Sequence, residues 1–345
     1  MRPSLRLELA AALGVGILLA AVPVLIPGNI TLLNLGILTF LYVAQGVAWN
    51  ILGGFAGYVS FGYAAFFGLG AYTTALLWLA GWSPVLTYPV AGLVAAAFSL
   101  LVGAPTLRLI GPYFSIATIG VGEAMRILML NLDKITGGAS GLNLPTVVPS
   151  KTWFYFVALI CAAIAYAVAA WIRSARFGLG LTALRLDLEA AESLGVRTTL
   201  FKNLAHIVSA ALVGACGGVY ATYLQYVHPD TVFSFTHSIS LVLIALIGGL
   251  GTVWGPVLGA VVFFVVQDYL QTSYPSFHLL VYGLLLLLII LFEPGGMAGL
   301  AGRLVARLRH ASTGSPAAAP APHAEHGGAP MPRTETERPG TKRTT

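Results

Sequence analysis

The sequence predicts an all-α membrane protein, a bundle of about eight to ten transmembrane helices with one charged helical segment on the cytoplasmic side that does not cross the membrane. Of its 345 residues, 57% are hydrophobic and only 9% are charged, whereas a soluble domain has about 25% charged residues. No Asp, Glu, Lys or Arg occurs between Leu9 and Leu107, a length that several crossings of about 20 residues would fill. Because backbone groups in lipid must bond to one another, these apolar runs are expected to be helices.

About ten apolar segments follow one another along the chain, near residues 9–26, 30–52, 58–80, 85–104, 112–131, 153–172, 203–226, 236–250, 255–270 and 276–293. Arg2 and Arg6 precede the first segment, as in a signal peptide. No small-residue cleavage site follows, so the segment is interpreted as a retained span. Several segments are rich in glycine and could be broken or re-entrant, which leaves the number of spans open.

The charged residues between the segments predict the topology. With the N-terminus inside the cell, the basic residues fall on the cytoplasmic side, at Arg108, in residues 174–202 and in a tail with Arg303, Arg307 and Arg309. The opposite connections carry little charge, at Asp133, Lys134, Lys151 and Asp230. The positive-inside rule therefore predicts two cytoplasmic termini, and it explains the formal charge of +6 better than nucleic-acid binding does.

Two glycine clusters lie within the apolar segments, and their members are Gly53, Gly57 and Gly62 in the first and Gly248, Gly249, Gly255 and Gly259 in the second. The pairs 53/57 and 255/259 each form a GxxxG pattern. Small residues let helices approach closely, and glycine beside proline also permits breaks next to a polar cavity. Close packing is the ordinary explanation, and lining of a pore is the alternative.

Glu123 and Arg126 are candidate functional residues because both lie inside the apolar segment 112–131. Their spacing of three residues places them on one helix face. Intramembrane charges usually mark a transport pathway or a buried pair, and a purely structural ion pair is equally consistent with the sequence. The loop NLDKITGGASGLNLP that follows is expected outside the cell, as a gate, a docking loop or an ordinary connection.

No catalytic or metal-binding motif occurs in the chain. The histidines lack metal-ligand spacing, and there is no GxSxG or HExxH sequence. A P-loop requires Gly-Lys before Ser or Thr, and glycine precedes none of Lys134, Lys151, Lys202 and Lys342. We therefore expect no metal, no cofactor and no ATP to be bound by this chain itself.

Residues 174–202, SARFGLGLTALRLDLEAAESLGVRTTLFK, form a charged island between apolar segments. Its apolar positions recur at helical spacing, at Leu181, Leu184, Leu188 and Ala191, and its charged positions fall on another face, at Arg185, Glu189 and Glu192. The pattern predicts one amphipathic helix that ends at Gly195 with a left-handed cap. Such a helix is too short and too charged to cross a bilayer, so it lies on the membrane or docks into a partner.

Within this island, Glu189-Ala190-Ala191-Glu192-Ser193-Leu194-Gly195 resembles the EAAxxxG motif of membrane subunits of prokaryotic ABC importers. Further stretches are similar to the branched-chain amino acid permease family, in its LivM-like branch, and they include GYVSFGYAAFFGLGAYTTALL, LRLIGPYFSIATIGVGEAMRI, LGVRTTLFKNLAHIVSAALVGACGGVYA and IGGLGTVWGPVLGA. They cover most of the chain from about residue 50 to 300. The chain departs from the family in the long tail after Arg309.

The resemblance implies a permease subunit in a prokaryotic inner membrane, in contact with lipid and paired with a second similar permease. It also implies two cytoplasmic ATPase subunits, which use ATP and Mg²⁺, and an external substrate-binding protein. By this resemblance, Glu189, Ala190, Ala191 and Gly195 belong to the coupling helix that docks in the ATPase. Residues 1–309 would form the permease domain, and residues 310–345, rich in Ala, Pro and Thr, a disordered cytoplasmic tail.

Leucine, isoleucine and valine are the expected solutes. Urea, short amides, and other amino or aromatic acids fit the same architecture. From a different functional class, an ion-coupled secondary transporter would use Glu123 as its proton or cation site.

Overall fold

The computed structural model describes residues 14–16, 18–23, 25, 29–145, 149–273, 278–292 and 295–299. Of the predicted first span, 9–26, the structure describes residues 14–16, 18–23 and 25, which are helical. The predicted tail, 310–345, and its basic neighbours Arg303, Arg307 and Arg309 fall entirely outside them.

The long elements are α2 (Ile30–Asn50), α3 (Tyr63–Leu79), α4 (Pro84–Thr106), α5 (Pro112–Asn131), α7 (Lys151–Ser174), α10 (Thr198–Leu224), α12 (Phe235–Gly248), α13 (Gly255–Ser273) and α14 (His278–Phe292). The short helices are η1 (Ile51–Phe55, a π-helix), α6 (Asp133–Thr136), η2 (Gly138–Ser140, a 3₁₀ turn), α8 (Arg176–Leu186), α9 (Leu188–Ser193) and α11 (Pro229–Val232). Two short strands are β1 (Leu142–Asn143) and β2 (Tyr226–Val227). Further helical residues are described at 14–16, 18–23, 25 and 296–299.

The predicted all-α membrane class is confirmed. Six helical segments in the described part of the chain are long and apolar enough to cross a membrane, namely α2 with η1, α4, α5, α7, α10 and α11 with α12. The helices α3 and α13 are apolar but shorter. The chain is therefore a multi-pass membrane protein built from helices.

Two predicted boundaries differ from the structure. The segment expected at 58–80 becomes helical only at Tyr63, because Gly57 has a left-handed backbone (φ +80°) and the indole Nε1 of Trp49 donates to the Ser60 carbonyl at 2.8 Å. The segment expected at 203–226 already begins at Thr198. Its first turn is polar, so hydropathy missed it, yet Lys202 is buried with its Nζ 5.0 Å from the centre of the Tyr58 ring.

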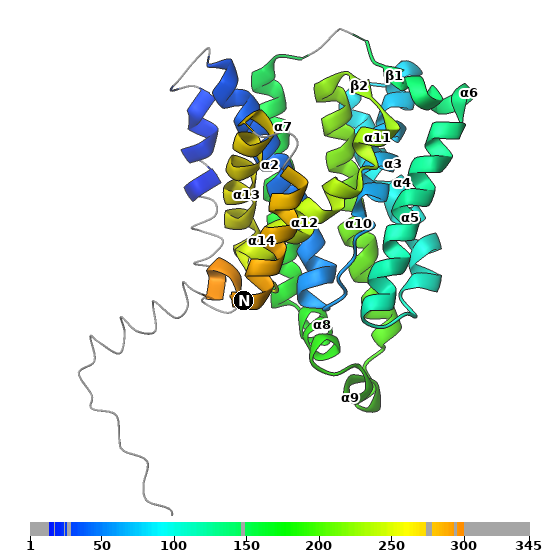
Figure 1. The fold of residues 1–345 in the computed structure, drawn as a ribbon, viewed down its shortest axis with the longest axis vertical. Coiled ribbons are helices and arrows are strands. Elements are labelled where there is room, and N and C mark those ends of the chain that lie inside the picture. Colours follow the sequence, from blue (N-terminus) through cyan, green and yellow to red (C-terminus); the bar gives the residue numbers. More distant parts are fainter. Residues whose placement is uncertain are drawn as a thin grey trace, which may run out of the picture. The chain divides into compact units, whose positions relative to one another are not determined.

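Helix α10 is the centre of the packing, with α3 and α4 against it, while α2 packs against α7 and α13 (Figure 1). These contacts are close because small residues face one another. A methyl group on Gly70 would overlap the backbone of Gly214 in α10, and one on Gly217 would overlap the carbonyl of Phe67 in α3. Between membrane helices, dispersion contacts of this kind replace the hydrophobic driving force that acts in water.

Opposite ends of the bundle carry different structures (Figure 1). At one end, β1 pairs antiparallel with β2, with Leu142 opposite Val227. The imidazole Nε2 of His228 lies 3.0 Å from the Ala139 carbonyl, and the Tyr226 hydroxyl donates to the Ser140 carbonyl at 3.1 Å. The Gly- and Asn-rich loop after α5 is thus tied to the chain that follows α10. Helices α8 and α9 lie at the other end.

Asn50 joins α2 to the turn between α12 and α13. Its Nδ2 donates to the Thr252 carbonyl at 2.7 Å, and its Oδ1 accepts from the Gly251 amide at 3.0 Å, with the residue fully buried. We expect Asn50→Ala to lower the free energy of unfolding by about 2 kcal/mol, because the buried amide is lost and two partly buried backbone groups lose their partner. Thermal unfolding in detergent measures the loss. Asn131→Ala, at an exposed helix end, is the control and should be near neutral.

Candidate functional site

The charged segment between α7 and α10 projects from one end of the bundle as two helices, α8 and α9 (Figure 1). The prediction of a single amphipathic helix is therefore wrong. Asp187 interrupts it with an extended backbone (φ −159°, ψ 117°), and its Oδ1 accepts from the Ala190 amide at 3.0 Å. Aspartate is a favoured N-cap because its carboxylate satisfies an amide that has no partner in the first turn. Its presence just before LEAAES was the signal for a new helix start.

The end of α9 matches the expected left-handed cap. Gly195 has φ +81°, its amide donates to the Glu192 carbonyl at 2.9 Å, and the Val196 amide donates to the Ala191 carbonyl at 3.0 Å. These two bonds form a Schellman motif, which satisfies the last carbonyls of the helix. The chain then turns directly into α10. Glu189, Ala190 and Ala191 thus lie on a helix of fixed length that is capped at both ends.

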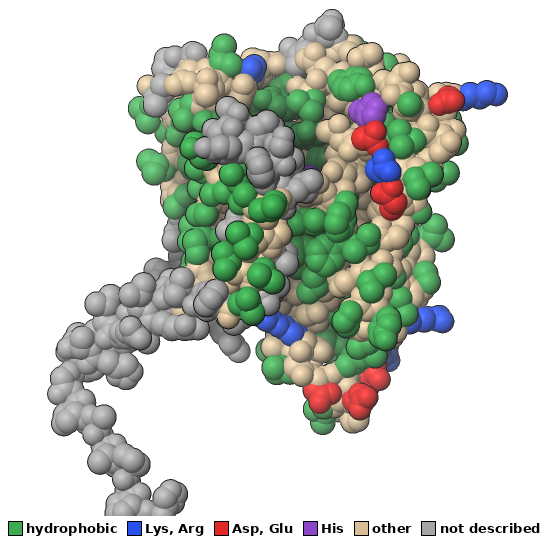
Figure 2. Space-filling view, viewed as in Figure 1, with side chains coloured by type: hydrophobic (Ala, Val, Ile, Leu, Met, Phe, Trp, Pro, Cys, Tyr) green, Lys and Arg blue, Asp and Glu red, His purple; other side chains and the backbone are tan. Residues whose placement is uncertain are grey.

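The two helices bury one face and expose the other. Leu181, Leu184 and Ala191 are buried, whereas Glu189, Ala190 and Glu192 are exposed. Two large apolar side chains are also exposed, Leu186 at 81% and Leu194 at 86%. Leu186 is the last residue of α8 and Leu194 directly follows α9, and Figure 2 shows acidic side chains beside hydrophobic ones at this end of the molecule. Exposed apolar side chains rimmed by polar ones are typical of sites that interact with a protein or a membrane.

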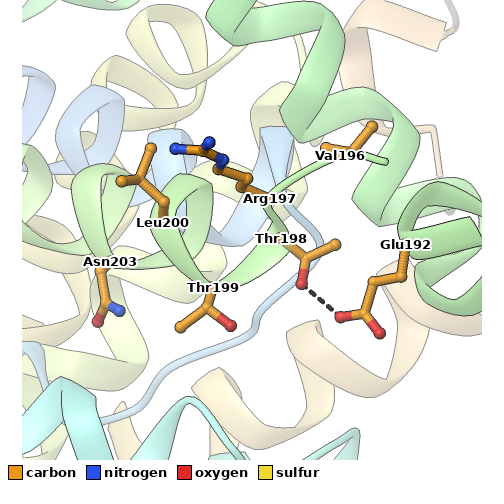
Figure 3. Close-up of a pocket in the computed structure, with 7 residues that line it drawn as sticks. All are labelled: Glu192, Val196, Arg197, Thr198, Thr199, Leu200 and Asn203. Atoms are coloured by element: carbon orange, nitrogen blue, oxygen red, sulfur yellow. Dashed lines mark hydrogen bonds between the residues drawn. The ribbon is translucent and has the colours of Figure 1, made fainter. Parts of the chain in front are cut away.

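A concavity of about 520 Å³ lies beside α9, where the chain enters α10. It is lined by Glu192, Val196, Arg197, Thr198, Thr199, Leu200 and Asn203 (Figure 3). The Thr198 hydroxyl and the Glu192 carboxylate point toward each other, with Oγ1 and Oε1 2.5 Å apart. This bond ties the end of α9 to the first residue of α10. A displacement of α9 would therefore act directly on the central helix of the bundle.

Arg185 connects α8 to the glycine-rich turns of the bundle. Its Nη1 donates to the Gly54 carbonyl at 2.7 Å, and its aliphatic part covers Gly57, where an added Cβ would lie 3.1 Å from its Cγ. The same guanidinium lies so close to Gly251 that a side chain there would overlap it. The segments that carry the two glycine clusters thus meet at one arginine of the charged segment. Sequence reasoning had placed Arg185 only on the polar face.

All seven glycines singled out in the sequence lie at close contacts or in left-handed backbone. A Cβ on Gly62 would lie 2.6 Å from the Thr118 carbonyl oxygen, and one on Gly249 (φ +113°) would lie 2.7 Å from the Ala298 Cβ. The remaining members face the Trp49 ring (Gly53), the Arg185 stem (Gly57), the Gly255 backbone (Gly248), Thr252 and Gly248 (Gly255), and the Ile244 carbonyl (Gly259). Each position therefore has a packing or backbone reason for glycine. A role in lining a pore stays a prediction.

Glu123 and Arg126 form an ion pair on α5, with Nε 3.0 Å from Oε2, and Arg126 also pairs with Asp230 of α11. The exposed fraction of the side chain is 47% for Glu123, 30% for Arg126 and 52% for Asp230, so this chain does not bury them in its own core. Charges in a membrane span face a protein partner or an aqueous cavity rather than lipid. The pairing of Asp230 with Arg126 was not predicted, because Asp230 follows 104 residues later and is near Arg126 only through folding.

Arg126→Gln is expected to reduce transport more than Glu123→Gln or Asp230→Asn does. The arginine substitution leaves two carboxylates facing each other, whereas each carboxylate substitution leaves Arg126 with one partner. The three variants are ranked by their uptake, normalised to the amount of subunit in the membrane. Equal uptake for all three variants and the unsubstituted chain would remove any role for the cluster.

Comparisons with known proteins match most of the chain. The family model described as branched-chain amino acid transport system / permease component matches residues 31–290. The high-affinity branched-chain amino acid transport system permease protein LivM of Salmonella typhimurium is 31% identical over 301 residues, which cover 76% of this chain and 69% of that protein. LivM of Escherichia coli K12 gives the same identity and coverage.

A second group of relatives is more distant. The permease protein LivH of Escherichia coli K12 is 22% identical over 291 residues, which cover 75% of this chain and 91% of that protein. No solved structure matches this chain significantly.

Proposed function

The chain belongs to the family of branched-chain amino acid transport permeases, and on that premise we propose that it is one membrane subunit of an ATP-driven importer. The single observation that supports coupling to a motor is the doubly capped helix α9, with Leu186 exposed just before its N-cap and Leu194 exposed at its C-terminal end. A separate ATPase dimer would cover this surface and bind the ATP and Mg²⁺. This chain supplies the docking helix and no nucleotide site.

Movement would pass from α9 into the bundle by two contacts. Thr198 holds α9 to α10 through Glu192, and Arg185 holds α8 to the turns that follow α2 and α12. Closure of the ATPase dimer on ATP would therefore shift helices on both sides of the bundle, because packed helices move as rigid bodies between discrete arrangements. A second permease of the same family would complete the pathway, and an external binding protein would deliver the solute.

The proposed topology places α8, α9 and both termini in the cytoplasm of a prokaryotic cell, in its inner membrane. The end with β1 and β2 then faces outward, toward the binding protein. Branched-chain amino acids are the first choice of solute, because they are named in the relatives that cover most of this chain. Other small amino acids, urea and amides are the solutes to test next.

Site-specific photocross-linking tests the docking surface. Ala191 is only 3% exposed and is unsuited to carry the probe, whereas Leu194 is 86% exposed. A photoreactive residue at Leu194 is expected to capture an ATPase subunit in native membranes, and the same probe at Ser140, exposed at the opposite end, is the control. Capture of no ATPase from Leu194 in a complex that transports would overturn the proposal.

Uptake into liposomes separates the two functional classes. The complete complex is expected to accumulate leucine only with ATP. If this chain alone accumulated leucine with an ion gradient and no ATPase, the secondary-transporter alternative, with Glu123 as the coupling site, would replace the proposal.

A further inference from the structure

A cavity of about 360 Å³ lies inside the chain, between α2, α12 and α13. Its size falls within the range of small-molecule sites, about 300–1,000 Å³. The residues that line this cavity come from segments far apart in the sequence, so no sequence motif predicts it. It lies away from the surface of α9 and has no residue in common with the concavity there.

One wall of the cavity is polar and contains a buried side-chain oxygen that has no hydrogen-bond partner. Gln267 of α13 is 8% exposed, and its Oε1 has no partner, while its Nε2 donates to the Tyr42 hydroxyl at 3.3 Å. A buried polar atom without a partner costs about 1–3 kcal/mol, and a ligand that bonds to it recovers that free energy. The neighbouring residue Asp268 also lines the cavity, and it is the one charged residue between Asp230 and Glu293 in the sequence.

A second wall is formed by the first turn of α12, a helix of 14 residues. Ser234, Thr236 and His237 of this turn line the cavity, and the Ser234 side chain does not cap the helix. The N-terminus of a helix carries a partial positive charge, and its first amides point outward. A carboxylate is therefore the group that this wall favours.

The remaining walls are apolar. Leu41, Phe67 and Phe264 are at most 5% exposed and line the cavity together with Leu38. His237 is held in place by two contacts, stacked on Phe67 with ring centres 4.2 Å apart and bonded through Nε2 to the Gln45 Oε1 at 2.7 Å. The cavity thus combines a site for an anion, a site for a cationic donor and an apolar surface.

We propose that this cavity binds a zwitterionic α-amino acid with an aliphatic side chain during transport. The carboxylate lies at the start of α12, the ammonium group donates to Gln267 and Asp268, and the side chain packs against Leu41, Phe67 and Phe264. The inference rests on the proposed function, because it places the transported solute within this subunit. It adds that this chain selects the solute itself, independently of the external binding protein.

Thiol protection in the complete reconstituted complex tests the site. Cys161 and Cys216 are first replaced by alanine, and Ser234→Cys is then modified with a cationic methanethiosulfonate. Leucine is expected to slow this modification by roughly tenfold or more, as a ligand that fills the cavity would. Ser140→Cys, exposed and outside the cavity, is the control and should react at the same rate with and without leucine.

Two analogues separate recognition of both charges from simple filling of the apolar space. Leucinol lacks the carboxylate and 4-methylpentanoate lacks the ammonium group, so neither should protect Ser234→Cys at the concentration at which leucine does. Equal protection of Ser234→Cys by all three compounds would overturn the inference. No protection by leucine, in a complex that transports leucine with ATP, would overturn it as well. Neither result would contradict the proposed function. A complex without ATP-driven leucine uptake contradicts the proposed function instead.

A second variant measures binding without a thiol. Gln267→Leu is expected to raise the leucine concentration for half-maximal uptake by roughly tenfold, since a charged donor loses its acceptor. Val265→Leu, on the same helix, 62% exposed and outside the cavity, should leave that concentration unchanged. If the leucine concentration for half-maximal uptake were the same in Gln267→Leu and Val265→Leu, Gln267 would not be an acceptor for the ammonium group.

Discussion

A Gly195→Val subunit is expected to reach the membrane and assemble, but to lose at least about tenfold in solute transported per ATP hydrolysed. Gly195 has φ +81° in the cap that ends α9. A left-handed backbone costs an ordinary L-residue about 1–2 kcal/mol, and a β-branched residue more. No atom lies within 4 Å of the position that a Cβ would take, so the expected effect comes from backbone conformation and not from a clash.

A graded series at Gly195 tests this cause. Gly195→Asn should retain most of the coupling, because asparagine tolerates left-handed backbone, and Gly195→Ala should be intermediate. Gly81→Val is the matched control, with φ +89° and equally open space in the turn between α3 and α4. It should carry a similar conformational cost without loss of coupling. Equal coupling in both valine variants would show that the cap of α9 plays no part in it.

Arg185→Met is expected to give the second large effect, a loss of roughly tenfold in the same ratio of transport to hydrolysis. The methionine keeps apolar cover over Gly57 but removes the bond to the Gly54 carbonyl and the contact with Gly251. Helix α8 then loses its attachment to the turns after α2 and α12. The ATPase would still dock on α9 and hydrolyse ATP, while the bundle would no longer follow its movement.

Arg176→Met provides the control for Arg185→Met, because Arg176 is exposed in the first turn of the same helix. It should transport normally. Arg185→Lys should recover part of the coupling, since a lysine supplies one donor for the Gly54 carbonyl but lacks the planar fork. Normal coupling in Arg185→Met would show that α8 acts on the bundle by another route.

The sequence and the structure agree most closely where a property is local. Hydropathy placed the helices α4, α5 and α7 within a few residues, because most of their length is apolar and each begins either with a proline or after a capping serine. It misplaced the start of α10, whose first turn is polar but packed inside. The break at Asp187 was missed because helical spacing of leucines continues across it, and a periodicity argument does not register one capping side chain.

The sequence by itself determined that this chain is a helical membrane protein with one charged segment, and it located the left-handed stop at Gly195. Those features follow from the solvent preference of consecutive side chains and from the freedom of a residue without a Cβ. Only the tertiary structure brought Asp230 to Arg126, Arg185 to Gly54 and Gln267 to the cavity beside α12. Each pairing joins segments that are remote in the chain, and it is the packing of whole helices that sets which of their side chains meet.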